Sequence, residues 1–308
     1  MTFARHHFDL IGDIHGHYDK LVAILQRLGY RLRGGAYCHS ERRTVIFLGD
    51  YIDRGPNVHD VLSTIRNMVD AGSALAVMGN HEYNAICYHT PDDKGDWLRP
   101  HRPDRDLGLR ATLRQFVGYD REWHEWIQWM RQLPLFLDLG RLRAVHACWD
   151  AKNIDLLHGL TLADDATLAA TSDKNSPLSK AAQWVLKGPE MHLPQGFVYH
   201  DKEGFPQNKV RVRWWDIPES TSAGGIAMPV SFDGTADADA AELRSLPDYP
   251  LEAPPVFFGH YWLPANQPKR PLRHNIACLD FSVGRGGPLV AYRWNGEHRL
   301  SASRFVSS

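Results

Sequence analysis

The chain has 308 residues, 43% of them hydrophobic and 23% charged, and its formal net charge is −1 at pH 7. These proportions are typical of a soluble globular protein that is long enough to bury a substantial core. The small net charge excludes a global electrostatic attraction to nucleic acid or to membranes, so any affinity for anions must come from local groups.

The sequence carries no signal for secretion or membrane insertion. The four cysteines, at positions 38, 87, 148 and 278, form no CxxC pair, which argues against a disulfide framework or a zinc ribbon and for a reducing compartment. The N-terminal stretch lacks the apolar segment of a signal peptide, and no apolar run reaches the length of a membrane span. We therefore expect a cytoplasmic protein without a membrane partner.

The N-terminal part of the chain alternates predicted strands with predicted helices. Apolar runs at Phe8–Ile11, Thr44–Leu48 and Ala74–Met78 predict buried strands. Between them, apolar residues recur at helical spacing over 21–28 and 61–69, and each stretch precedes a glycine that can end a helix. This alternation is typical of a parallel sheet covered by helices, so the predicted fold class is α/β.

The second half of the chain contains four further predicted strands, at Leu142–Val145, Val256–Phe258, Ile276–Phe281 and Leu289–Trp294. Residues 84–133 become rich in Trp and Leu, and the aromatic stripe of a helix expected near their end favours core packing. Residues 151–250 include a predicted hairpin around 201–204 and a segment at 220–241 with the composition of a mobile loop. We expect a single domain over residues 1–308, with 84–133 and 151–250 as insertions.

Polar motifs follow the first three predicted strands, at the sheet edge where open α/β folds bind their ligands. After the first strand, Asp13 and His15 lie two residues apart on a glycine-flanked turn and can point at one ion. This pair alone is weak evidence, because a helix-capping Asp beside an unrelated His explains it equally well. After the second strand, the segment GDYIDRGP at 49–56 adds Asp50, a carboxylate that can bridge two cations.

The loops after the second and third predicted strands supply groups suited to phosphate chemistry. Asp53 can orient a neighbouring base, and Arg54 can hold phosphate oxygens through its bidentate fork. After the third strand, the segment GNHE offers the side-chain oxygen of Asn80 as a hard ligand and His81 as a proton donor.

The motifs DxH, GDxxDRG and GNHE, in this order and spacing, resemble the calcineurin-like metallophosphoesterase superfamily. The resemblance points to the branch of phosphoprotein phosphatases and bacterial diadenosine tetraphosphatases. It covers residues 13–146 and 259–294, and it does not extend to 84–133 or 151–250. It implies a two-sheet sandwich flanked by helices, with a cap formed by the two insertions.

The resemblance also implies that two divalent ions are bound by residues at the strand ends. The implied ligands are Asp13, His15, Asp50, Asn80, His146 and His260. Asp50 would bridge the two ions. Because the ligand set mixes oxygen with nitrogen, it suits Mn²⁺, Fe or Zn²⁺ better than Ca²⁺. Many phosphodiesterase members carry a second His where this chain has Trp262, and that departure is shared with the named branch.

For catalysis, the resemblance implies that His81 is the general acid, that Asp53 holds its tautomer, and that Arg54 binds the phosphoryl oxygens. A looser likeness around 213–216 makes Arg211 or Arg213 a candidate second clamp for phosphate, although an exposed Arg on a strand is an equally good interpretation. A non-catalytic scaffold would have lost a ligand or His81, and this chain retains them all.

The substrate prediction is a phosphomonoester, with phosphoprotein Ser/Thr phosphate favoured and a dinucleoside tetraphosphate as the alternative. Aromatic and basic residues of the two insertions offer faces for bases and cations for phosphates: Tyr88, Trp97, Trp184, Trp214, Trp215, Arg99, Arg102, Arg105, Arg211 and Arg213. The alternative is that these aromatic residues form the core of the cap. The run HYDK at 17–20 also resembles bacterial RNA-end phosphatases. No basic patch accompanies it, so we expect no stable nucleic acid complex.

Overall fold

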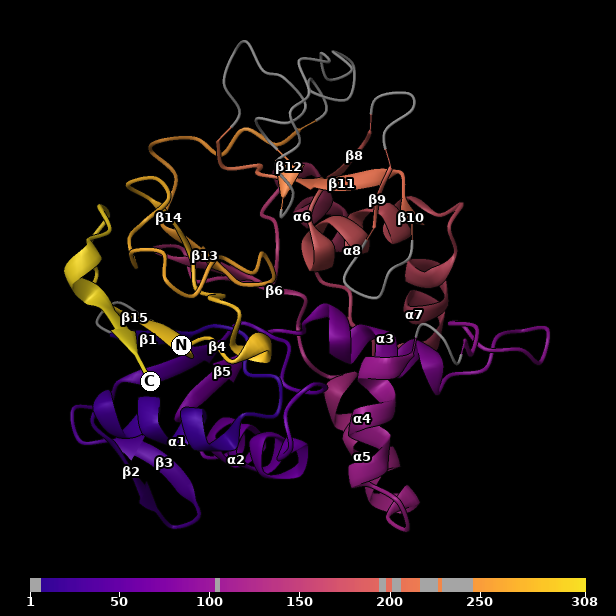
Figure 1. Ribbon diagram of the computed structural model, residues 1–308, viewed down its shortest axis with the longest axis horizontal. Helices are drawn as coiled ribbons and strands as arrows, with labels where there is room; N and C mark the ends of the chain where they lie inside the picture. Colours follow the sequence, from indigo (N-terminus) through magenta and orange to yellow (C-terminus); the bar gives the residue numbers. More distant parts are fainter. Residues whose placement is uncertain (1–6, 103–105, 194–197, 201–205, 217–226, 229–245) are drawn as a thin grey trace.

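Two sheets form the centre of the molecule in a computed structural model of the chain (Figure 1). The structure describes residues 7–102, 106–193, 198–200, 206–216, 227–228 and 246–308. The first sheet has the strand order β16-β15-β1-β4-β5, and the second has the order β14-β13-β7-β6. The mixed α/β fold expected from the sequence is confirmed.

The first sheet contains the strands that the N-terminal apolar runs predict. Its members are β1 (Phe8–Ile11), β4 (Thr44–Phe47), β5 (Ala74–Ala76), β15 (Val290–Trp294) and β16 (Phe305–Ser307). β1, β4 and β5 are parallel, and β15 is antiparallel to β1, so that Phe8 lies opposite both Thr44 and Trp294. The sheet therefore joins the two ends of the described chain, as Figure 1 shows.

Helices α1 (Tyr18–Arg27) and α2 (Val58–Asp70) pack against the first sheet, below it in Figure 1. Each buries the apolar face that its spacing predicts, including Leu21 and Ile24 in α1 and Leu62 and Ile65 in α2. A hairpin of β2 (Tyr30–Arg33) and β3 (Ala36–His39) follows α1. The sequence analysis missed it, because only the first residue of β2 is buried and no alternating apolar pattern marks that strand.

The second sheet consists of β6 (Phe136–Asp138), β7 (Arg143–Val145), β13 (Val256–Phe258) and β14 (Ile276–Cys278). Phe257 of β13 and Tyr292 of β15 place their ring centroids 5.0 Å apart, which brings the two sheets into contact. β14 is shorter than the predicted strand Ile276–Phe281, because the chain turns at Asp280, whose carboxylate accepts hydrogen bonds from two loop amides.

The first predicted insertion packs beside the sheets. It contains most of α3 (Asn80–Tyr88), together with α4 (Leu107–Gln115) and α5 (Asp120–Met130). The aromatic stripe of α5 is buried, with Trp123 and Trp126 in the core, so the prediction of core packing is confirmed.

The described residues of the second predicted insertion form three helices and several short strands. These are α6 (Ala151–Leu157), α7 (Asp165–Ser172), α8 (Pro177–Lys187), β8 (Glu190–His192), β9 (Tyr199–His200), β10 (Pro206–Gln207), β11 (Lys209–Val212) and β12 (Ala227–Met228). β9 pairs with β10 as the predicted hairpin. The expected loop at 220–241 lies outside the described residues except for β12. That 84–133 and 151–250 are insertions into one domain stays a prediction.

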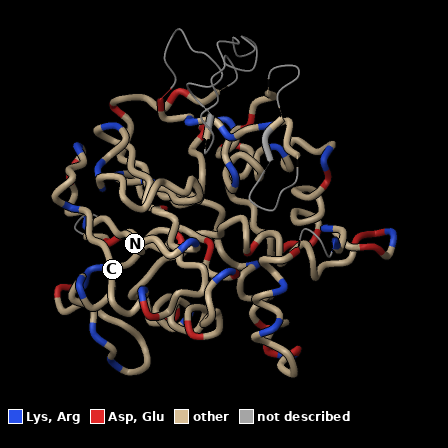
Figure 2. Tube along the Cα trace, viewed as in Figure 1, with Lys and Arg blue, Asp and Glu red and all other residues tan. Residues whose placement is uncertain are grey.

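Basic and acidic residues are interspersed along the Cα trace (Figure 2). No helix in the described part of the chain has the length and apolar composition required to cross a membrane. Two one-turn 3-10 helices, η1 (Val283–Arg285) and η2 (Ala302–Arg304), flank β15. η1 lies in the loop that follows β14 and is important for the site described below.

Candidate metal centre

The six candidate ligands all lie at strand ends of the two sheets. Asp13 and His15 follow β1, Asp50 follows β4, Asn80 begins α3 after β5, His146 follows β7, and His260 follows β13. His15, Asp50 and His260 have positive φ angles of 47°, 54° and 66°. Positive φ is uncommon for residues other than glycine and concentrates at functional sites, where the surrounding structure holds it in place.

Asp50 is at the centre of the cluster. Its Oδ1 lies 3.3 Å from Nε2 of His146, and its Oδ2 lies 3.5 Å from Nε2 of His15. Two groups of side chains have potential metal-ligating atoms within 4.8 Å of one another, namely Asp50 with His15 and His81, and Asp50 with His146 and His260. Asp50 belongs to both groups, so its carboxylate joins the two halves of the cluster.

One ring nitrogen of His146 faces side-chain oxygens of the cluster. Its Nδ1 bonds to the Leu48 carbonyl at 2.7 Å and therefore carries the proton. Its Nε2 lies 3.1 Å from Oδ1 of Asn80 as well as 3.3 Å from the carboxylate of Asp50. Acceptors this close need a positive charge among them, from a proton on the imidazole or from a cation.

The ring of His15 is oriented like that of His146, with Nδ1 at a backbone carbonyl. Its Nδ1 contacts the Ile52 carbonyl at 2.9 Å, while its buried Nε2 has no hydrogen-bond partner among the described residues. Both ring nitrogens of His260 are also buried without a hydrogen-bond partner in the described part of the chain. Burial lowers the pKa of both imidazoles well below the usual range, so they stay neutral, as metal ligation requires.

Asp13 completes the cluster from the other side. Both its oxygens accept a hydrogen bond from the backbone N–H of His260 at 3.1 Å. A Cβ on Gly259 would lie 1.9 Å from Asp13 Oδ1, so only glycine permits this approach. Burial, followed by the nearby carboxylates of Asp280 and Asp50, raises the pKa of Asp13 well above its usual range. Buried carboxylates this close need positive charge, and the donor set fits divalent cations.

Asp50 and His146 have shifted pKa values because they interact with each other. Burial opposes the charged form of Asp50, but the imidazoles of His146 and His81 hold the pKa of its carboxyl well below the usual range. For His146, burial acts to lower the pKa, and the Asp50 carboxylate outweighs it and raises the pKa. The anionic form of Asp50 is therefore stabilised, which suits a metal ligand.

His81 and Asp53 form a close pair beside this cluster. His81 Nδ1 lies 2.5 Å from Asp53 Oδ2, and its Nε2 lies 3.8 Å from Asp50 Oδ2. Burial acts to lower the pKa of His81, but the carboxylates of Asp50 and Asp53 outweigh it and raise the pKa. The imidazole thus retains a proton more readily than an isolated histidine, which suits a general acid.

Thr112 of α4 holds this pair from behind, and the sequence analysis did not identify it. Its hydroxyl donates to Asp53 Oδ1 at 2.6 Å and accepts from the Asp53 backbone N–H at 2.9 Å. Gln115 on the same helix contacts the same loop, with its amide donating to the Gly55 carbonyl at 3.0 Å. No sequence signal identified Thr112, because the contact joins residues 59 positions apart.

Glu82 is the second residue whose role the sequence analysis did not assign. Its buried carboxylate accepts from the backbone N–H groups of Asp50 at 2.9 Å, Tyr51 at 2.8 Å and Gly79 at 2.9 Å. It thereby ties the loop after β4 to the loop after β5. The fourth letter of the GNHE motif was a signal for it, since a Glu in the first turn of a helix commonly bonds back to the preceding backbone.

The three candidate phosphate-binding arginines have different surroundings. Arg54 has a φ angle of 68° and stacks on Trp262, with its Cζ 4.2 Å from the ring centroid. Arg211 Nη1 donates to the His260 carbonyl at 3.4 Å, so it lies beside the cluster. Arg213 Nε is buried without a hydrogen-bond partner among the described residues, and no described contact joins Arg213 to the ligands.

Two of the aromatic residues suggested to stack on bases do not do so. Trp214 and Trp215 are 1% and 5% exposed and pack on Phe258 of β13 with centroid distances of 5.1 and 5.2 Å. That suggestion is wrong for both, because their rings are part of the core behind the second sheet. Trp97 is 39% exposed and stacks on His101.

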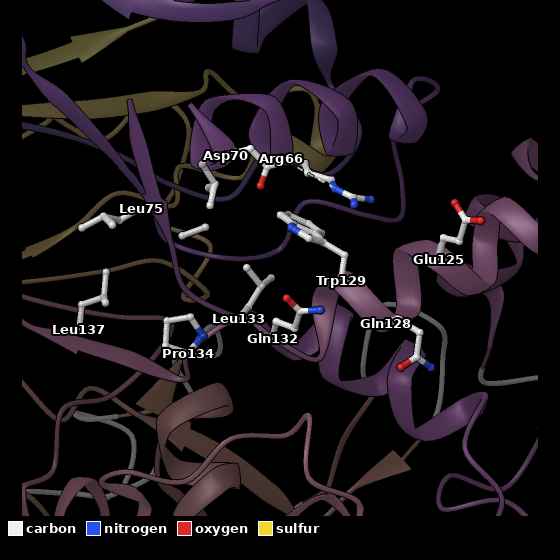
Figure 3. A pocket seen from close by; sticks show the side chains of 12 residues that line it. Arg66, Asp70, Leu75, Glu125, Gln128, Trp129, Gln132, Leu133, Pro134 and Leu137 are labelled. Atoms are coloured by element: carbon white, nitrogen blue, oxygen red, sulfur yellow. Dashed lines mark ion pairs between the residues drawn. The ribbon is translucent and has the colours of Figure 1, made fainter. Parts of the chain in front are cut away.

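Two cavities lie away from the cluster. One, of about 550 Å³, lies between α2, β5 and α5 and is lined by residues such as Arg66, Leu75 and Trp129 (Figure 3). The other, of about 950 Å³, is lined by residues of α6 and α8 and of the segment 246–254. None of the candidate ligands lines either cavity, so the chemistry of the cluster does not extend into them.

The fold and the cluster define a class, that of metal-dependent hydrolases acting on phosphate esters. The sequence model of the calcineurin-like phosphoesterases matches residues 6–187, which is more than half of the chain. The chain belongs to the calcineurin-like phosphoesterase family, whose members use divalent metal ions.

Among curated proteins, the chain is 43% identical over 74 residues to the asymmetrical bis(5'-nucleosyl)-tetraphosphatase PrpE of Bacillus velezensis, which covers 24% of this chain and 30% of that protein. It is 30% identical over 144 residues to PrpE of Oceanobacillus iheyensis, covering 45% of this chain and 54% of the relative. The chain thus spans between about a third and about half of the length of these two relatives.

Among solved structures, a mutant cold-active protein tyrosine phosphatase is similar with a TM-score of 0.50 and 17% identity, covering 97% of this chain and 81% of that one. This likeness concerns the fold alone.

Proposed function

We propose that two divalent metal ions are held by Asp13, His15, Asp50, Asn80, His146 and His260, with manganese as the preferred metal and iron or zinc as alternatives. The gathering of buried, unsatisfied acceptors around Asp50 is the observation that carries this proposal. The mixed oxygen and nitrogen donors suit such transition ions better than calcium.

We assign His81 to proton transfer and not to metal binding, although it lies within reach of Asp50. Its Nδ1 pairs with Asp53, which fixes the tautomer and supports the charge, and its Nε2 is the atom left to donate a proton to the leaving oxygen. When bound, the two ions would polarise the phosphoryl oxygens and acidify the attacking water. Arg54 would bind the phosphoryl oxygens through its planar fork.

For the substrate, we propose a compound with a chain of phosphates, of the dinucleoside tetraphosphate kind. The similarity to bis(5'-nucleosyl)-tetraphosphatases supports this choice. This reverses the ranking that the sequence alone favoured, in which phosphoprotein Ser/Thr phosphate came first and the dinucleotide second.

The test compares kcat/KM on diadenosine tetraphosphate and on a phosphoserine peptide, with protein loaded with Mn²⁺. We expect a preference of about a hundredfold for the dinucleotide, which corresponds to one or two charge-assisted hydrogen bonds. Metal-stripped protein is the control and should be inactive on both substrates. A faster reaction with the phosphopeptide would overturn the substrate assignment and leave the metal centre standing.

A further inference from the structure

Trp262, two residues after His260, contacts two guanidinium groups. The Cζ atoms of Arg54 and Arg285 each lie 4.2 Å from the centroid of its ring. Because both distances are 4.2 Å, the two Cζ atoms are at most 8.4 Å apart, although Arg54 and Arg285 are far apart in the sequence. Stacking on an aromatic ring orients a guanidinium while its N–H groups remain available for an anion.

The loop that carries Arg285 is firmly held against the metal centre. Both oxygens of the buried Asp280 are used, one accepting from the Trp262 N–H at 2.8 Å and the other from the Ser282 N–H at 2.9 Å. Lys20 of α1 donates to the Gly287 carbonyl at 2.7 Å at the other end of the loop. Asp280 therefore sets the position of Trp262 relative to η1, which ends at Arg285.

The same loop lies directly beside the catalytic residues. A Cβ added to Gly284 would lie 2.4 Å from Cδ of Arg54 and 3.1 Å from Cδ2 of His15. No side chain fits at position 284, between the loop and these two residues, one a candidate metal ligand and the other the candidate phosphate clamp. Arg285, the next residue, is exposed, and no carboxylate of the described residues pairs with it. Its charge is accordingly available to a ligand.

We propose that Arg285, stacked on Trp262, forms an anion subsite beside Arg54 that binds the phosphate group next to the one being hydrolysed. This inference rests on the proposed function and deepens it, because it names the residue that distinguishes a polyphosphate from a monoester. The Trp262 ring and the Asp280 bonds fix the guanidinium in advance, so less side-chain entropy is lost when the phosphate binds. A monoester has no second phosphate to fill the subsite.

The test measures two ratios for the Arg285→Ala variant, both with Mn²⁺-loaded protein. The first is kcat/KM on diadenosine tetraphosphate relative to p-nitrophenyl phosphate. The second is the inhibition constant of inorganic orthophosphate relative to that of pyrophosphate, measured on p-nitrophenyl phosphate hydrolysis at fixed free Mn²⁺. We expect both ratios to fall roughly tenfold to a hundredfold, the value of a charge-assisted hydrogen bond. Arg285→Lys should lose less, because it keeps the charge without the planar fork.

Arg121→Ala is the matched control. It removes the same charge from α5, where the Arg121 side chain is 95% exposed and pairs with Glu125, and it should change neither ratio. The outcomes separate the two proposals. If the unaltered protein hydrolyses diadenosine tetraphosphate and Arg285→Ala leaves both ratios as they were, the subsite is wrong and the proposed function stands. If the unaltered protein does not hydrolyse it, the proposed substrate is wrong, and the pyrophosphate ratio alone decides whether the subsite exists.

Discussion

The two sides of the candidate metal centre are built from different kinds of contact. On one side, Asp53 is 4% exposed and Thr112 is fully buried, and directional hydrogen bonds join Thr112 to Asp53 and Asp53 to His81. On the other side, the guanidiniums of Arg54 and Arg285 stack on Trp262, which orients them and leaves their N–H groups available to an anion. The difference teaches that both kinds of contact orient a group in advance: hydrogen bonds also fix the tautomer of an imidazole, whereas stacking orients a guanidinium without using its N–H groups.

The largest effect should come from Asp50, which lies at the centre of the cluster and belongs to both groups of candidate ligands. Asp50→Asn removes the negative charge that joins the two halves of the cluster, so we expect the loss of both metals and of activity on every phosphate ester. Elemental analysis of the Mn²⁺-loaded variant, beside the unaltered protein, measures the occupancy. About two ions bound to the variant, with activity retained, would show that Asp50 is not a bridge.

Breaking the hydrogen-bonded side alone should leave the metals in place. His81→Asn should lower kcat by roughly 10²–10⁴ on an alkyl phosphate, the usual contribution of acid–base catalysis. The loss should be much smaller on p-nitrophenyl phosphate, whose leaving group needs no proton. Loss of metal from this variant would instead identify His81 as a ligand, which its distance of 3.8 Å from Asp50 permits.

The pH dependence of kcat on an alkyl phosphate should test the role of Asp53. The carboxylates of Asp50 and Asp53 outweigh the effect of burial and raise the pKa of His81, so the protonated acid persists to higher pH. Asp53→Asn removes one of them, which lowers that pKa and shifts the alkaline limb of kcat on an alkyl phosphate to lower pH. A limb that stays in place would indicate that another group is the acid.

The smallest of these effects should come from Thr112, which hydrogen-bonds to Asp53 of the His81–Asp53 pair. Thr112→Val keeps the shape of the side chain and removes the hydroxyl that bonds to Asp53. We expect kcat on an alkyl phosphate to fall by about 10–100-fold, as for other residues that orient a functional group, with little change in KM. Thr112→Ser should restore most of the rate. An equal fall on p-nitrophenyl phosphate would mean that Thr112 acts on the fold and not on proton transfer.

The sequence by itself determined the parts of this protein that are encoded locally. The strands β1, β4 and β5 and the helices between them follow from the spacing of apolar residues, and the candidate ligands from their places at the strand ends. Parallel strands bring those ends to one edge of a sheet, so a local pattern was enough to gather Asp13, Asp50 and Asn80.

Only the tertiary structure decided which distant residues complete the site. Thr112 reaches Asp53 because α4 packs on the loop after β4, and Arg285 meets Trp262 because Asp280 joins two loops. It also decided that Trp214 and Trp215 lie in the core and not on a substrate face. The physical reason is that spacing along the chain specifies which face of an element is apolar, whereas long-range packing determines what that face meets.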